Sequence, residues 1–136
     1  MANEMFDGFD HAQYQDEVTT KWGADAHAKS DQWWRSQSPA ERESFKREAK
    51  AISTVYAAAQ WAGHSVSGAI VQAIVARHYR WVAAGWAGTR PDAAAFVGLG
   101  QMYVDDERFA ANYGGADGAQ YVCDAMRAYV ESELAS

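Results

Sequence analysis

The sequence has few of the residues and patterns that mark special classes of protein. Its 136 residues include one cysteine, Cys123, and two prolines. A single cysteine cannot form an intramolecular disulfide, which excludes a disulfide-stabilised scaffold. No apolar run approaches the roughly 18 residues that a membrane span requires, and the N-terminus has no basic segment ahead of an apolar one. We therefore expect a soluble, cytoplasmic protein that does not contact a membrane.

Positive charge is also scarce. Twelve basic residues stand against 18 acidic ones, which gives a net charge of −6 at pH 7. Because the basic residues are scattered and an acidic chain repels phosphate backbones, we expect no direct binding of nucleic acid. The four histidines lack the i, i+3 or i+4 spacing of metal ligands, so the sequence predicts neither a metal nor another cofactor. A catalytic set is likewise absent, and we expect a protein that is not an enzyme.

What the sequence does contain is helical periodicity along almost its whole length. A chain of this size forms one domain. The clearest helix start is Ser38, which stands at an N-cap position before Pro39, with Glu41 placed to reach back to it. This capping box predicts a long core helix that ends near Gly63.

Similar signals predict an all-α domain of about seven helices. The apolar stripe that includes Ile70, His78 and Trp81 predicts a central, well-covered helix. Thr89 and Asp92 resemble a second capping box, which opens the helix that contains Phe96. The expected helices cover residues 10–23, 25–35, 38–63, 67–84, the segment after this second box, 106–113 and 117–134.

The segment 96–109 carries a signature as well as a composition. Phe96, Leu99 and Tyr103 share one helical face, while Asp105 and Asp106 offer caps for a following short helix. This pattern resembles the TipAS family of antibiotic-binding domains. Three earlier segments occur in the order and spacing of that family: residues 9–18, Lys21-Trp22-Gly23 and Arg77-His78. The resemblance extends from about residue 9 to about residue 129.

The resemblance implies a globin-like helical packing and an antibiotic of thiopeptide or albicidin type as ligand. It places the domain at residues 8–134, after a flexible segment 1–7. TipAS-type domains are commonly the effector-sensing part of MerR-like regulators, which also carry a DNA-binding winged helix and a coiled coil that these 136 residues do not contain. We therefore expect either a monomeric or weakly dimeric binder that confers resistance by sequestration, or the drug-sensing domain of a transcription regulator.

Two cysteines found in the family are absent. A thiopeptide-binding relative carries a cysteine immediately before the Leu-Gly-x-Met-Tyr-Val run, where its thiolate adds to the dehydroalanine tail of the antibiotic. The matching position is Gly98, and a second family cysteine falls near Pro91. Cys123 has no neighbouring basic residue to favour its thiolate. Binding is therefore expected to be reversible.

Aromatic residues are abundant, with six tryptophans, seven tyrosines and five phenylalanines. Aromatic residues at helical spacing are usually core residues, and we assign Phe45, Tyr56, Tyr121 and Tyr129 to the core. Trp33 and Trp34 differ, because adjacent helical side chains point about 100° apart and do not both face one core. At least one of these two rings should border a cleft or lie exposed.

These observations suggest an aromatic cleft with a mobile lid. A flat heteroaromatic ligand fits a pocket of rings and methionine, and helices shorter than roughly 12 to 15 residues are only marginally stable alone. Residues 1–35 would form the lid, and the 67–84 helix with the helix after it would form the floor. The predicted ligand contacts are Tyr14, Trp22, Trp33, Trp34, His78, Trp81, Phe96, Leu99, Met102 and Tyr103.

Other interpretations remain open at this stage. His78 can equally be a hydrogen-bonded core histidine, and Met102-Tyr103 can be packing residues. A helical protein-interaction module would use exposed aromatic residues to bind a partner helix. A haem carrier would use His78 as an iron ligand.

Overall fold

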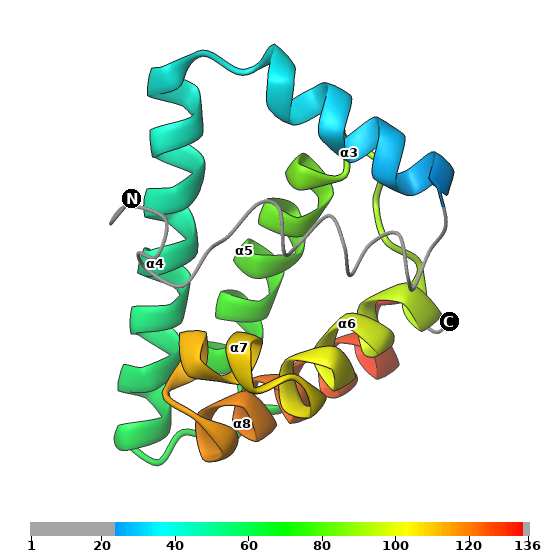
Figure 1. Ribbon diagram of the computed structural model, residues 1–136. Helices are drawn as coiled ribbons and strands as arrows, with labels where there is room; N and C mark the ends of the chain where they lie inside the picture. The colour runs from blue at the N-terminus through cyan, green and yellow to red at the C-terminus, as the bar shows by residue number, and fades with distance from the viewer. Residues whose placement is uncertain (1–23, 135–136) are drawn as a thin grey trace.

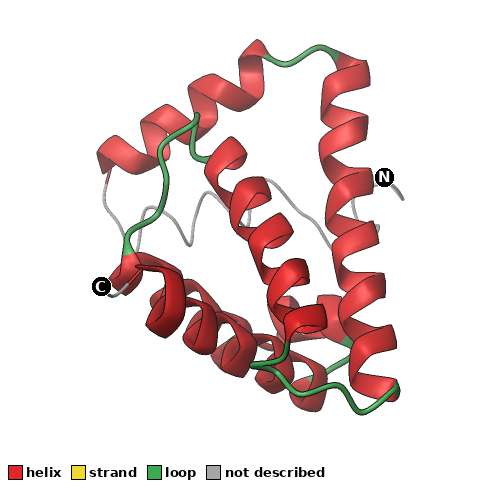
Figure 2. Cartoon of the chain, turned by 180° about the vertical axis from the view of Figure 1, so that it is seen from behind, coloured by secondary structure: helices red, strands yellow, loops and turns green. Residues whose placement is uncertain are grey.

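A computed structural model of the protein describes residues 24–134. Within this part of the chain every regular element is a helix and no strand occurs (Figure 2). The described residues form six α-helices and two short helices of other types. The predicted all-α class is confirmed, and the packing agrees with the globin-like arrangement that the resemblance implies. The predicted helix over residues 10–23 and the predicted flexible segment 1–7 lie outside the described residues.

The first two described helices begin where the sequence predicts. Helix α3 (Ala24–Ser36) is followed directly by α4 (Pro39–Trp61). The predicted capping box at α4 is present: Glu41 N–H donates to Ser38 Oγ at 3.1 Å, and Ser38 N–H donates to Glu41 Oε1 at 2.8 Å. This reciprocal pair satisfies two of the free donors at the helix start and fixes the turn between the two helices.

Helix α5 (Ala69–Gly85) runs through the middle of the molecule, antiparallel to α4 (Figure 1). It packs on α4 and on the last helix. Its Val71, Val75, His78, Tyr79 and Val82 are buried. The predicted stripe is wrong at one end, because Ile70 is 55% exposed. Ile70 stands in the first turn of α5.

The signature segment folds as two helices joined by a cap. Helix α6 (Ala93–Asp105) has Asp92 as its N-cap, with Ala95 N–H donating to the carboxylate at 2.8 Å. The predicted capping box with Thr89 is wrong, because the backbone of Thr89 belongs to the preceding turn, where its N–H donates to Trp86 O. Asp106 then caps α7 (Glu107–Ala110), and a 3₁₀ turn, η2 (Ala111–Tyr113), follows.

The chain ends on α8 (Ala116–Tyr129), which continues as a short π-helix, η3 (Val130–Leu134). Gly114 and Gly115 separate it from η2 with φ angles of 87° and 103°, which only glycine adopts readily. Helix α8 packs closely on α6, and at their contact an added Cβ on Gly100 would lie 3.1 Å from the Sδ of Met126 and 3.5 Å from the Cα of Cys123. Cys123 is buried in this contact. The two helices form the lower layer of Figure 1.

No helix within residues 24–134 is both long and apolar enough to cross a membrane.

Candidate functional site

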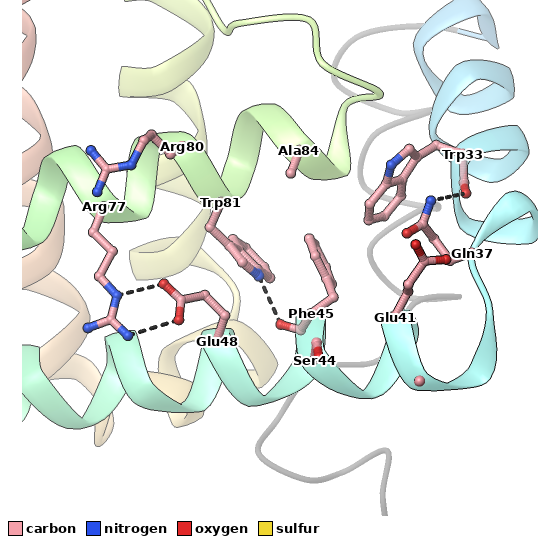
Figure 3. Close-up of a pocket in the computed structure, with 11 residues that line it drawn as sticks. Trp33, Gln37, Glu41, Ser44, Phe45, Glu48, Arg77, Arg80, Trp81 and Ala84 are labelled. Atoms are coloured by element: carbon pink, nitrogen blue, oxygen red, sulfur yellow. Dashed lines mark hydrogen bonds and ion pairs between the residues drawn. The ribbon is translucent and has the colours of Figure 1, made fainter.

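A cleft of about 640 Å³ opens between α3, α4 and α5. Figure 3 shows its walls: α4 and α5 face each other across it, and the C-terminal end of α3 closes one end. Trp33 lies at the α3 end together with Glu41, and the charged side chains of Glu48, Arg77 and Arg80 lie at the opposite end. The lining residues are Trp33, Gln37, Ala40, Glu41, Ser44, Phe45, Glu48, Arg77, Arg80, Trp81 and Ala84.

Three aromatic rings form a continuous wall of the cleft. Phe45 and Trp81 stack with ring centroids 4.5 Å apart and planes at 19°. Trp33 packs edge-on against Phe45 at 5.0 Å. The indole N–H of Trp81 donates to the carbonyl oxygen of Phe45 at 3.0 Å, which fixes the orientation of the indole. Because these rings are already held in place, a flat ligand can stack on their apolar surface, and binding does not have to order mobile side chains.

The other end of the cleft is ionic. Arg77 donates from Nε and Nη2 to the two carboxylate oxygens of Glu48 at 2.6 Å and 2.8 Å. Both side chains remain 37% exposed. The hydrogen bonds from Arg77 lower the pKa of Glu48, and the same contact raises the pKa of Arg77. The pair therefore stays charged at neutral pH and ties α4 to α5.

Helix α3 is attached to the rest of the molecule by a few polar contacts. The buried hydroxyl of Ser30 donates to Gly85 O at the end of α5, at 3.2 Å. Arg42 donates to the carbonyl oxygens of Trp34 and Arg35 at 3.1 Å and 3.3 Å, and its guanidinium lies 5.5 Å from the centre of the Trp34 ring. Arg42 thus satisfies carbonyl groups that the last turn of a helix leaves free.

A buried cluster of polar rings supports the cleft from behind. His78 is fully buried one turn before Trp81, and their ring centroids are 6.4 Å apart. Its Nδ1 lies 2.8 Å from the hydroxyl of Tyr56, and its Nε2 lies 3.2 Å from the hydroxyl of Tyr103. Because a neutral imidazole has one donor and one acceptor, both ring nitrogens are satisfied without a proton being added. Burial lowers the pKa of His78 to about 3.

This buried histidine predicts a dependence of stability on pH. In the unfolded chain a histidine takes up a proton near pH 6.5, whereas folded His78 does not until about pH 3. The stability it provides is therefore complete above pH 6.5 and is lost as the pH falls towards 3. We expect the free energy of unfolding to fall by about 2 kcal/mol between about pH 7 and pH 5.

Urea titrations at several pH values measure this slope. His78→Gln should flatten the slope over this range, whereas His64→Gln, which changes an exposed side chain, should keep it. An unchanged slope in His78→Gln would contradict the assignment.

The predicted ligand contacts fall into three groups in the structure. Trp33 and Trp81 line the cleft, and for Trp33 this is one of the two positions, at a cleft or exposed, that were expected for a ring of the Trp33-Trp34 pair. Trp34 is half-buried and packs against Phe45 at 5.9 Å without lining the cleft. Tyr14 and Trp22 lie outside the described residues.

The third group is in the core. The structure places these residues at 0–3% exposure, packed against one another, and not on the cleft wall. They are His78, Phe96, Leu99, Met102 and Tyr103. The physical reason is that α6 packs on α8 and turns its aromatic face inward, so that α4, and not α6, forms the second wall. Ligand contact by these five residues stays a prediction that the cleft geometry does not favour.

Several lining residues were missed by the sequence reasoning. Phe45, assigned to the core, is half-buried at the cleft, while Tyr56 is buried as predicted and Tyr121 and Tyr129 are half-buried. The missed residues of α4 recur at helical spacing at positions 41, 44, 45 and 48. Those of α5, at positions 77, 80 and 84, lie on the same helical face as the predicted Trp81. A mixed aromatic and charged face on each of two neighbouring helices was the available signal.

The structure argues against the haem interpretation. An iron ligand needs a free ring nitrogen, and both nitrogens of His78 are engaged by tyrosine hydroxyls. Within residues 24–134 no group of three or more histidine, cysteine, aspartate or glutamate side chains is arranged to hold a metal ion.

Comparisons with known proteins agree with one another. Residues 14–129 match the family described as the TipAS antibiotic-recognition domain. The chain is 36% identical, over 138 aligned positions, to the HTH-type transcriptional regulator SkgA from two strains of Caulobacter vibrioides. This alignment covers 92% of the chain and 52% of SkgA, so the chain spans about half the length of these relatives.

A solved structure is also similar. The fold matches TipAS from a thiopeptide antibiotic multidrug resistance system of Streptomyces lividans, determined in complex with nosiheptide. The TM-score is 0.74 with 26% sequence identity, and the match covers 97% of this chain and 95% of the other.

Proposed function

Because this chain belongs to the family of TipAS antibiotic-recognition domains, we propose that it binds a bulky, flat heteroaromatic antibiotic of the thiopeptide kind in the cleft between α3, α4 and α5. The observation that carries this proposal is the wall formed by Trp33, Phe45 and Trp81. A cleft of about 640 Å³ lies in the range of small-molecule sites, which are roughly 300–1,000 Å³. Ring stacking supplies affinity there, and the polar residues around it supply orientation.

A fluorescence titration with nosiheptide tests the proposal. A heteroaromatic ligand stacked on Trp33 or Trp81 should quench tryptophan emission to saturation, with micromolar or tighter affinity, equivalent to about −8 kcal/mol. Trp61 is 93% exposed and would contribute a constant background, so Trp61→Phe sharpens the signal. Quenching that rises linearly with ligand and never saturates would contradict specific binding.

Binding in this cleft is reversible in our proposal. Gly98 offers no thiol, and Cys123 is buried at 1% exposure between α6 and α8, on helices that do not line the cleft. The intact mass of the protein after incubation with nosiheptide and denaturation should therefore be that of the free chain.

We further propose that α3 acts as a lid over one end of the cleft. It is a 13-residue helix, close to the length at which isolated helices are marginal, and it supplies Trp33 to the lining, while Gln37 follows its last residue. Hydrogen exchange should be faster for backbone amides of α3 than for those of α8 in the free protein, and nosiheptide should slow exchange in α3. Equal protection of both helices without ligand would contradict the lid.

Residues 8–134 would then form a complete drug-binding domain, used either to sequester the antibiotic or to sense it. The similarity to longer HTH-type regulators favours sensing, in which ligand binding at this domain is coupled to a second module. Sequestration requires only tight stoichiometric binding.

A further inference from the structure

The charges at the ionic end of the cleft do not balance. Among the described lining residues, this end holds two guanidinium groups, Arg77 and Arg80, and one carboxylate, Glu48. Both oxygens of that carboxylate accept from Arg77. Arg80 acts on Glu48 only at a distance, through its charge. One positive charge is therefore left over, in a protein whose net charge is −6.

The remaining acidic residue of the cleft does not compensate this charge. Glu41 lies at the other end, near Trp33, as Figure 3 shows. One of its oxygens accepts from the backbone of Ser38 in the capping box, where the carboxylate also complements the positive end of the helix dipole. Its charge is thus already matched by the start of α4.

Arg80 is exposed and lies next to the aromatic wall. It precedes Trp81 on α5 and lies one turn from both Arg77 and Ala84, so these four residues share the face that borders the cleft. In Figure 3, Arg77 and Arg80 lie on one side of Trp81, and Trp33 lies on the other. Within the described part of the chain, the guanidinium of Arg80 makes no hydrogen bond and no ion pair with another side chain.

From this arrangement, and resting on the proposed function, we propose that the cleft selects flat aromatic ligands with a carboxylate or another anionic group at one end, which Arg80 binds while the rings stack on Trp81 and Phe45. A guanidinium is suited to this role because its planar donors bind oxyanions in a fixed geometry. Arg80 is then a specificity residue of the cleft.

Two dyes that share a ring system test this proposal. Anilinonaphthalene sulfonate and N-phenylnaphthylamine differ in the sulfonate, and both become fluorescent in apolar sites. Arg80→Gln should weaken binding of the sulfonate dye by about fivefold to tenfold at low ionic strength and leave the neutral dye unchanged. Arg80→Lys should keep most of the preference. Added salt should reduce it, because the site is exposed.

Two control variants separate the possible failures. Arg127→Gln removes the same charge from an exposed position on α8, outside the cleft, and should alter neither affinity. Trp81→Phe should weaken both dyes if they occupy the cleft. If both dyes depend on Trp81 and the Arg80→Gln variant keeps the preference for the sulfonate, this proposal is wrong and the proposed function stands. If the binding of neither dye depends on Trp81, the cleft is not the ligand site and both proposals are overturned.

Discussion

Replacing Trp81 by alanine should weaken nosiheptide binding by at least about a hundredfold, equivalent to about 2.7 kcal/mol. Trp81 is the indole whose orientation is fixed within the wall, by the stack on Phe45 and the hydrogen bond to its carbonyl oxygen. Removing it takes away the ligand-facing ring and also the ring that stacks on Phe45. Tryptophan residues in such ordered pockets are common binding hot spots. Isothermal titration calorimetry measures the change directly.

Two variants keep this prediction open to refutation. Trp81→Phe retains a ring and loses the indole N–H, and we expect a loss of less than about tenfold, because most of the stacking area is preserved. Trp61→Ala removes an indole that is 93% exposed and outside the cleft, and its affinity should equal that of the wild type. Since a tryptophan-to-alanine change can cost about 3–5 kcal/mol of stability, thermal melts of each variant accompany the titrations. A folded Trp81→Ala variant with unchanged affinity would remove the cleft as the site.

The largest effect on stability should come from Gly118→Ala. Gly118 lies in the first turn of α8, where a Cβ would stand 1.5 Å from the carbonyl oxygen of Tyr113 and 2.7 Å from its carbonyl carbon. These atoms belong to the backbone and cannot rotate away, so the turn from η2 into α8 would have to shift as a whole. We expect the free energy of unfolding to fall by at least about 4 kcal/mol, measured by urea denaturation.

Gly98→Ala is the matched control for this effect. It is the same substitution, also within a helix, but a Cβ at Gly98 meets nothing within 4 Å. Alanine should raise the stability by about 0.5–1 kcal/mol, because it restricts the unfolded chain and favours the helix. Similar melting temperatures for the two variants would show that the close approach at Gly118 does not exist in solution.

The sequence was most informative where structure depends on neighbours along the chain. The capping box at Ser38 predicted the start of α4, and Asp106 is one of the two residues predicted to cap the short helix that follows α6. Both signals depend on groups a few residues apart in sequence, so they do not depend on how the helices pack against one another. The predicted cap at Thr89 was wrong because Asp92, three residues later, is an equally good N-cap. The backbone N–H of Thr89 already donates to Trp86 O in the preceding turn.

The site was harder to predict. The adjacent indoles of Trp33 and Trp34 were expected to leave one ring at a cleft or exposed, because one helix cannot turn both towards a single core, and Trp33 lines the cleft. Phe45 and Phe96, however, are the same type of residue at the same kind of helical spacing. One lines the cleft and the other is fully buried. Nothing within either helix distinguishes them.

By itself the sequence determined the helical class, the family and most helix boundaries, since periodicity, caps and turns are properties of short segments. The tertiary structure alone decided that α4 and α5, and not α6, form the walls of the cleft, and that Glu48 is paired with Arg77. The reason is that helices distant in sequence decide whether an aromatic or charged side chain lies in the core, lines the cleft or forms an ion pair. Their relative placement depends on the packing of the whole domain.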